Sequence, residues 1–204
     1  MSSASRSVEI AAAAARWVVD EGMEYGEAKR RAARETLRRG GRQAELPSNA
    51  EVELAVREHL SLFCADSQPG ELRALRELAL TWMERLAAFR PHLGGAAWRG
   101  TATRRSALHI DLYCDDVKGA EIALLNLGVD YDTSELARTR GEPIPVLTLA
   151  ARSEALEDWV TLHLLVQDLD DQRGALKPDE QGQSWRGDVQ ALRRLLAPAA
   201  GDER

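Results

Sequence analysis

The stretch LGGAAWRGTATRRSALHIDLYCDD, residues 93–116, decides how the second half of this chain folds. Near its end, apolar and polar side chains alternate, and a period of two is typical of a β-strand. A strand places alternate side chains on opposite faces, so we expect His109 and Asp111 to stand together on one face. The set expected to pack inward on the other face is Leu108, Ile110, Leu112 and Cys114.

Two adjacent glycines, Gly94 and Gly95, precede this strand. Glycine adopts turn conformations that other residues avoid and allows another group to approach the backbone closely. We therefore interpret the stretch as a short strand, a glycine turn, a polar loop and a second strand with a polar face.

Size and composition indicate a globular protein. With 204 residues, 44% of them hydrophobic and 29% charged, the chain suits one medium domain, or one domain with a helical extension. No apolar run approaches the ~20 residues of a membrane span, so we expect no membrane partner. The alanine-rich N-terminus is predicted to be a helix of the mature protein, because Glu9, Trp17 and Asp20 do not fit a signal peptide.

Cysteine usage and charge bear on compartment and partners. Cys64 and Cys114 lie in apolar patterns without metal-type spacing, which predicts buried thiols in a reducing cytoplasm. A net charge of −6 argues against a dedicated double-stranded DNA binder. However, the segment KRRAARETLRRGGR, between Lys29 and Arg42, carries seven basic side chains. It is either a solvated helix face or a patch that attracts RNA, nucleotide phosphate or a protein partner.

The first half of the chain is predicted to be helical. One helix covers residues 11–19, and a second ends near Arg39, before Gly40 and Gly41. Ser48 and Glu51 have the spacing of a capping box, which predicts the start of a third helix. A longer helix is expected to begin near residues 67–69 and to end before Pro91.

Strands are expected to dominate the second half. Asp115 or Asp116 is predicted to cap a helix that ends at Leu127. Strands are expected at residues 129–132, 144–151 and 159–166, followed by a final helix capped by Ser184. Helices followed by strands predict an α+β fold, with a helical extension over residues 1–66 and an α+β domain over 67–200.

The glycine pair, the Arg99-Gly100 step and the polar strand resemble the nucleotidyltransferase fold shared by DNA polymerase beta, poly(A) polymerases and small bacterial nucleotidyltransferases. In that family, a glycine turn contacts the nucleotide phosphates. The next strand presents two aspartates, often as Ser-Asp-x-Asp, to two magnesium ions, and a third carboxylate comes from a later strand. The resemblance covers roughly residues 72–171 and implies a mixed β-sheet packed with helices.

The resemblance also implies roles for individual residues. Counted from Arg99, the family motif falls on residues 106–109, where Ala107 and His109 replace the aspartates. A register two residues later uses His109 and Asp111 as the catalytic pair. Apart from the resemblance, His109 and His163 are either ordinary hydrogen-bonded histidines or, if their strands are neighbours, form a mixed metal site with Asp111 that suits zinc, manganese or nickel better than magnesium. The cofactor of an active enzyme would be Mg²⁺ or Mn²⁺. The residues implied to hold nucleotide phosphate are Gly94, Gly95, Arg99 and Thr101.

Three functions stay open from the sequence. The first is transfer of a nucleoside monophosphate from a nucleoside triphosphate to a hydroxyl of RNA, protein or a small molecule. The second is a degenerate member that has lost its carboxylates and binds nucleotide, RNA or protein. The third is an interaction protein whose N-terminal helices dock a partner. A P-loop and a Gly-x-Ser-x-Gly elbow are both missing from the sequence.

Overall fold

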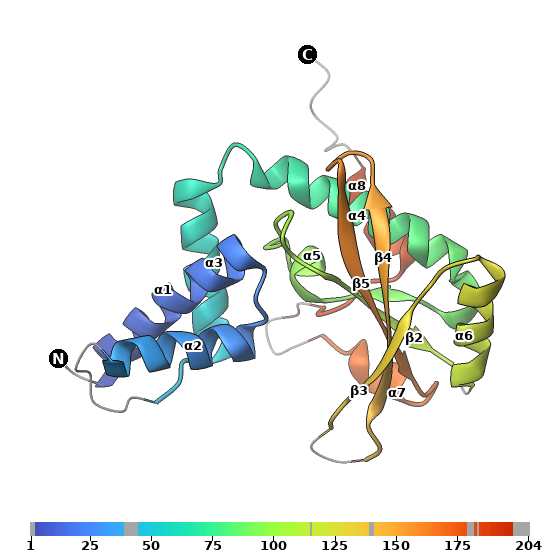
Figure 1. The fold of residues 1–204 in the computed structure, drawn as a ribbon, viewed down its shortest axis with the longest axis horizontal. Coiled ribbons are helices and arrows are strands. Elements are labelled where there is room, and N and C mark those ends of the chain that lie inside the picture. Colours follow the sequence, from blue (N-terminus) through green and yellow to red (C-terminus); the bar gives the residue numbers. More distant parts are fainter. Residues whose placement is uncertain are drawn as a thin grey trace. The chain divides into compact units, whose positions relative to one another are not determined.

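The computed structural model describes residues 3–38, 45–114, 116–138, 141–178, 182 and 184–197. The chain divides into two compact units. The first unit consists of residues 1–71 and 101–106, and the second of residues 72–100 and 107–204. Figure 1 shows the elements of both units, and each unit is described by itself below.

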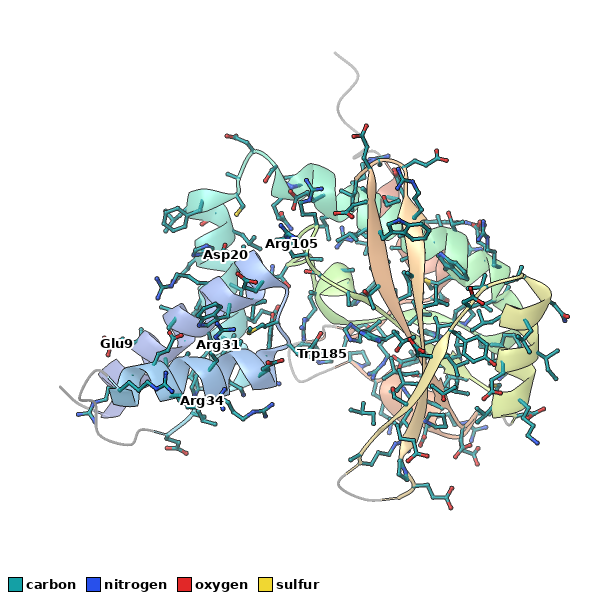
Figure 2. All side chains as sticks on the ribbon, viewed as in Figure 1. Glu9, Asp20, Arg31, Arg34, Arg105 and Trp185 are labelled. Atoms are coloured by element: carbon teal, nitrogen blue, oxygen red, sulfur yellow. The ribbon has the colours of Figure 1, made fainter. Side chains whose placement is uncertain are left out.

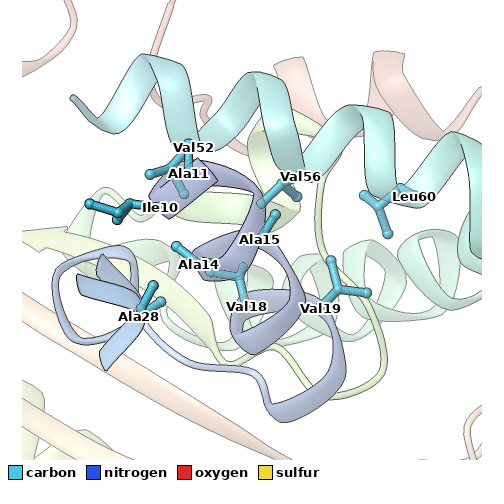
Figure 3. Close-up of a cluster of buried hydrophobic side chains, with 11 residues drawn as sticks. Ile10, Ala11, Ala14, Ala15, Val18, Val19, Ala28, Val52, Val56 and Leu60 are labelled. Atoms are coloured by element: carbon cyan, nitrogen blue, oxygen red, sulfur yellow. The ribbon is translucent and has the colours of Figure 1, made fainter. Parts of the chain in front are cut away.

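The first unit is helical, as predicted for the N-terminal region. It contains α1 (Ser3–Glu21), α2 (Tyr25–Arg38) and α3 (Asn49–Phe63). Their apolar sides meet in one core in which small alanines lie between branched residues, so the helices approach closely (Figure 3). The buried members of this core are Ile10, Ala11, Ala14, Ala15, Val18, Val19, Ala28, Ala32, Val52, Val56 and Leu60.

The predicted capping box at the start of α3 is confirmed. The Ser48 hydroxyl accepts a hydrogen bond from the Glu51 N–H at 3.2 Å, and the Glu51 carboxylate accepts one from the Ser48 N–H at 2.7 Å. The Ser48 and Ser7 hydrogen bonds and nearby Lys29 together hold the pKa of Glu51 below its usual value, the Ser48 bonds contributing most. The predicted end of α2 at Arg39, Gly40 and Gly41 lies outside the described residues.

Residues 101–106 complete the first unit although they lie far along the chain. The Thr103 hydroxyl donates to the Val19 carbonyl at 3.3 Å, and the Gln68 side chain donates to the Ala102 carbonyl at 2.9 Å. A β-carbon on Gly22 would lie 2.1 Å from the Arg105 carbonyl oxygen, so this approach requires a glycine.

The second unit contains a five-stranded mixed sheet, which confirms the α+β class. Its strand order is β1-β2-β5-β4-β3, with β2 and β5 parallel and the other neighbours antiparallel (Figure 1). The strands are β1 (His92–Leu93), β2 (Leu108–Tyr113), β3 (Asp132–Leu136), β4 (Ile144–Ser153) and β5 (Asp158–Gln167). The helices are α4 (Gln68–Arg85), which crosses the boundary between the units, the 3₁₀ turn η1 (Ala87–Phe89), α5 (Gly95–Arg99), α6 (Val117–Asn126), α7 (Asp171–Ala175) and α8 (Val189–Leu196).

The two faces of the sheet differ as the alternation predicted. Leu108, Ile110 and Leu112 of β2 are fully buried, and the β5 residues that share their face are buried as well. The opposite face carries His109 and Asp111. The buried side chains of α4 are Ala74, Leu75, Ala79, Trp82 and Met83.

Some predicted boundaries are wrong. Residues 129–131 are not a strand: the Val129 N–H bonds back to the Leu124 carbonyl at the end of α6, and β3 begins only at Asp132. The five residues of β3 are all exposed, so no apolar alternation marks it. Asp188, rather than Ser184, caps α8, since the Asp188 side chain accepts from the Ala191 N–H. The expected polar loop after the glycines contains α5.

The predicted cap of α6 is present, whereas the two cysteines are less buried than predicted. Asp116 caps α6, one of the two predicted alternatives. Cys64 and Cys114 are free but only half-buried, because each lies at the end of its element rather than inside the core. No helix in the described parts of the chain has the length and apolar character needed to cross a membrane.

Candidate functional site

The glycine turn lies directly on the polar face of β2. The Gly94 N–H donates to the His109 carbonyl at 3.0 Å, which continues the pairing of β1 with β2. Gly95 follows with φ +64°, and a β-carbon there would lie 3.2 Å from His109 Nδ1. The turn can reach the imidazole this closely only because Gly95 has no side chain.

The short helix after the turn is held in place by α4. The Arg76 guanidinium donates to the carbonyl oxygens of Ala97 and Trp98 at 2.9 and 3.1 Å, satisfying acceptors at the end of α5. Burial lowers the pKa of Arg76. These two bonds hold the C-terminal end of α5, whose last residue is Arg99.

The polar face brings two of the predicted metal ligands side by side. His109 of β2 pairs with His163 of β5, and their ring centroids are 5.1 Å apart. The Nδ1 of His163 also lies 3.0 Å from the Thr148 hydroxyl of β4. Both imidazoles are half-buried, so they stand at the surface of this face rather than in the core.

Asp111 is on the same face, but it is buried and its carboxylate is already paired. It is only 4% exposed, and both of its carboxylate oxygens are engaged. The Gln167 amide donates to Oδ1, and the Arg186 guanidinium donates to Oδ2 in an ion pair. Burial by itself lowers the pKa of Arg186, but the charge and hydrogen bond of Asp111 outweigh burial and raise it. The carboxylate is therefore neutralised by a residue of the protein itself.

Tyr113 lies beyond Asp111 on the same strand and is 1% exposed. Burial raises its pKa to about 12, and the negative charge of Asp111 adds to the shift. Within the described parts of the chain, its hydroxyl has no hydrogen-bond partner. Nearby, Arg138 donates to both Gln167 and Asp171, at 3.1 and 2.8 Å. The ion pairs of Arg138 and Arg186 thus belong to one chain of contacts through Gln167.

The residues present do not fit a magnesium site. Among the described residues, no group of three or more His, Cys, Asp or Glu side chains is arranged to hold a metal ion. Imidazoles are poor magnesium ligands, and the carboxylate of Asp111 is bound to a guanidinium. Neither the predicted set of Asp111, His109 and His163 nor the pair of Asp111 and His109 therefore supports a catalytic step through Mg²⁺.

The predicted phosphate-binding residues fall in different units. Gly94, Gly95 and Arg99 belong to the second unit and lie on or beside the turn. Thr101 belongs to the first unit and is 2% exposed.

Sequence reasoning missed the segment of residues 184–188, which supplies Arg186. Arg186 is 75 residues from Asp111 along the chain, and no local pattern connects the two. The local signal in this segment is a polar run before the last helix, and such a run predicts a helix cap rather than an ion pair. Trp185 from the same segment lies near Arg99, whose guanidinium carbon is 5.6 Å from the centre of the indole.

The basic helix α2 of the first unit lines a hollow of its own. A shallow hollow of about 350 Å³ lies along α2. Arg31 and Arg34 both lie on α2 in Figure 2, and the Arg31 guanidinium stacks 3.5 Å from the centre of the Trp17 ring. The residues that line the hollow are Glu27, Arg31, Arg34, Glu35 and Arg38.

Comparisons with known proteins gave no match: no protein-family model, no curated protein and no solved structure resembles this chain significantly.

Proposed function

We propose that the second unit is a catalytically degenerate nucleotidyltransferase-like fold that binds nucleoside triphosphate without metal-dependent transfer. One observation carries the proposal. The glycine turn packs on the polar face of β2 while the only carboxylate of the predicted site is already held by Arg186. Binding of a triphosphate needs the glycine turn beside His109, and it does not need the ion pair between Asp111 and Arg186 to break.

Charge supports a phosphate ligand at the turn. Asp111 and Arg186 cancel each other's charge, and Arg99 places a further guanidinium at the end of the short helix that follows the turn. The imidazoles of His109 and His163 stand together on the polar face, and His109 lies against Gly95 of the turn. Guanidinium and imidazole groups bind phosphate oxygens through charge-assisted hydrogen bonds and need no metal.

Calorimetric titration with each of the four nucleoside triphosphates tests this proposal, with EDTA and with added Mg²⁺ or Mn²⁺. We expect binding in EDTA that the metals leave unchanged. Binding only in the presence of metal would instead favour the transferase hypothesis and contradict metal-independent binding. Absence of binding in every condition would reject both.

Gly128 offers a matched control for substitution of Gly95. Gly95 and Gly128 have φ of +64° and +68°, so alanine meets similar backbone strain at both. Only at Gly95 does the new β-carbon meet His109, since nothing lies within 4 Å of it at Gly128. We expect Gly95→Ala to weaken triphosphate binding at least about tenfold and Gly128→Ala to leave it unchanged. Equal effects of the two variants would contradict the assignment of the turn.

For the first unit, the arginines of α2 favour RNA as a second ligand. Three arginines line one hollow with two glutamates, and Glu35 lies 4.0 Å from Arg31. We expect weak, salt-sensitive binding of single-stranded RNA, measured by fluorescence anisotropy and reduced in Arg34→Ala. Binding that is insensitive to salt would contradict this.

A further inference from the structure

Residues 184–188, called the strap below, form a short extended segment that is fastened beside the glycine turn at two points. Gly187 exchanges two backbone hydrogen bonds with Leu93 of β1, at 2.8 and 3.0 Å. The Trp98 indole N–H donates to the Ser184 carbonyl at 2.7 Å. A β-carbon on Gly187 would lie 2.0 Å from the Trp98 ring, so the ring packs directly on the strap backbone.

The strap runs past the turn itself. From the position of a β-carbon on Gly94, the Arg186 side chain is 3.6 Å away and the Trp185 carbonyl oxygen is 3.8 Å away. Trp185 therefore lies between two anchored residues, Ser184 and Gly187, next to the place where the proposed function puts the triphosphate. Its backbone position is fixed by neighbours on both sides.

The Trp185 side chain is 42% exposed although its backbone is held. Isolated exposed apolar residues are common on protein surfaces and need no special role. This indole differs because the Arg99 guanidinium lies 5.6 Å from its centre, within the range of cation–π attraction. An indole with a guanidinium over one face is suited to stack a nucleobase on its other face, while the cation attracts the negatively charged phosphates.

We propose that Trp185 is the stacking surface for the base of the nucleotide whose phosphates lie at the glycine turn. This inference rests on the proposed function and adds the part of the ligand that Trp185 recognises. The ligand class is a free nucleoside triphosphate, bound through its base and through its phosphates at neighbouring points of one surface. Inorganic tripolyphosphate carries the phosphates without base or ribose, so it separates the two parts of the ligand.

The test is calorimetric titration of ATP and of sodium tripolyphosphate, in EDTA, into wild type, Trp185→Ala and Trp185→Phe. Trp159→Ala is the matched control, because Trp159 is also exposed, at 62%, but lies at the start of β5. Loss of base stacking is expected to weaken ATP binding about tenfold in Trp185→Ala. Tripolyphosphate affinity is expected to stay within about twofold, and Trp185→Phe is expected to recover most of the loss because it keeps an aromatic face.

Each of the other outcomes contradicts either the stacking role of Trp185 or the proposed function. If tripolyphosphate binds and Trp185→Ala leaves ATP affinity unchanged, the stacking role fails and the proposed function stands. If Trp185→Ala weakens ATP and tripolyphosphate equally, or Trp159→Ala matches its effect, Trp185 acts on structure and not on the base. If neither ligand binds wild type, the proposed function fails, and the stacking role fails with it.

Discussion

Among single residues, Asp111 of the second unit carries a charge that the protein itself neutralises, through Arg186. Asp111 is nearly buried, and a buried charge is stable only with hydrogen bonds and a counter-charge. Gln167 and Arg186 supply these. The same pairing that makes a buried aspartate tolerable also occupies the oxygens that a metal would use.

The ion pair predicts strong coupling between two distant positions. Removing one partner leaves the other charge buried, so Asp111→Asn and Arg186→Met should each lower the free energy of unfolding by about 1–3 kcal/mol. The double variant should cost clearly less than the sum of the two, because no unpaired charge remains. Urea unfolding of the four proteins measures this coupling, and additive losses would show that the pair contributes nothing.

The raised pKa of Tyr113 predicts that the folded protein loses stability at alkaline pH. Its pKa is raised from 10.0 to about 12 in the folded protein, so the unfolded chain releases this proton first as pH rises. The stability linked to Tyr113 is therefore complete below about pH 10 and is lost as pH rises through about 12, by about 2–3 kcal/mol in total.

Tyr113→Phe isolates this effect from other titrating groups. The variant should match or exceed wild-type stability at neutral pH, because the buried hydroxyl has no described partner to lose. Its advantage in denaturant unfolding should grow between about pH 10 and 12. Parallel pH profiles for the two proteins would contradict the assignment.

At the scale of the element, the decisive pieces are short. The glycine turn, the five residues of α5 and the strap have little stability of their own, and each is fixed by contacts from elsewhere in the second unit. Arg76 holds the end of α5, and Trp98 and Leu93 hold the strap. Such elements form only when the sheet they rest on has formed.

Gly187→Ala should detach the strap. The added methyl group would overlap the Trp98 ring, and overpacking of this kind costs about 1–3 kcal/mol. We expect a lower melting temperature and a red shift of tryptophan emission, because both Trp98 and Trp185 lose neighbours. Gly174→Ala is the control, since nothing lies within 4 Å of its new β-carbon. A variant as stable as Gly174→Ala would show that the strap adjusts without cost.

At the scale of the whole molecule, the chain builds two units from interleaved segments. Residues 101–106 leave the second unit and complete the first, between α5 and β2. A cut between residues 71 and 72 therefore does not separate the units cleanly, because Thr103 and Ala102 bond to residues before the cut. Domain boundaries drawn as one point along the sequence miss this arrangement.

Deletion of residues 1–47 should expose the core of the first unit. Val52, Val56 and Leu60 of α3 are at most 6% exposed and pack in the same core as α1 and α2. Without these helices, their apolar surface meets water, and we expect self-association by size-exclusion chromatography with light scattering. A truncated chain that stays monomeric, with an unchanged melting temperature, would contradict this and would leave the N-terminal helices free for a partner.

Features that depend on near neighbours in the chain could be predicted from the sequence alone. The alternation around His109 was enough to separate the two faces of β2, and Ser48 with Glu51 was enough to place the start of α3, because periodicity and capping act within a few residues. It also predicted the α+β class, since helices precede strands.

The state of the candidate site depends on contacts that form only in the folded chain. The pairing of Asp111 with Arg186, the packing of Gly187 on Trp98 and the exposed indole of Trp185 all join segments that are remote in the chain. Contacts between remote segments depend on how the sheet orders its strands, and no local pattern encodes that order. The sequence could therefore predict a polar strand behind a glycine turn, but the fold determined that its carboxylate is paired with an arginine.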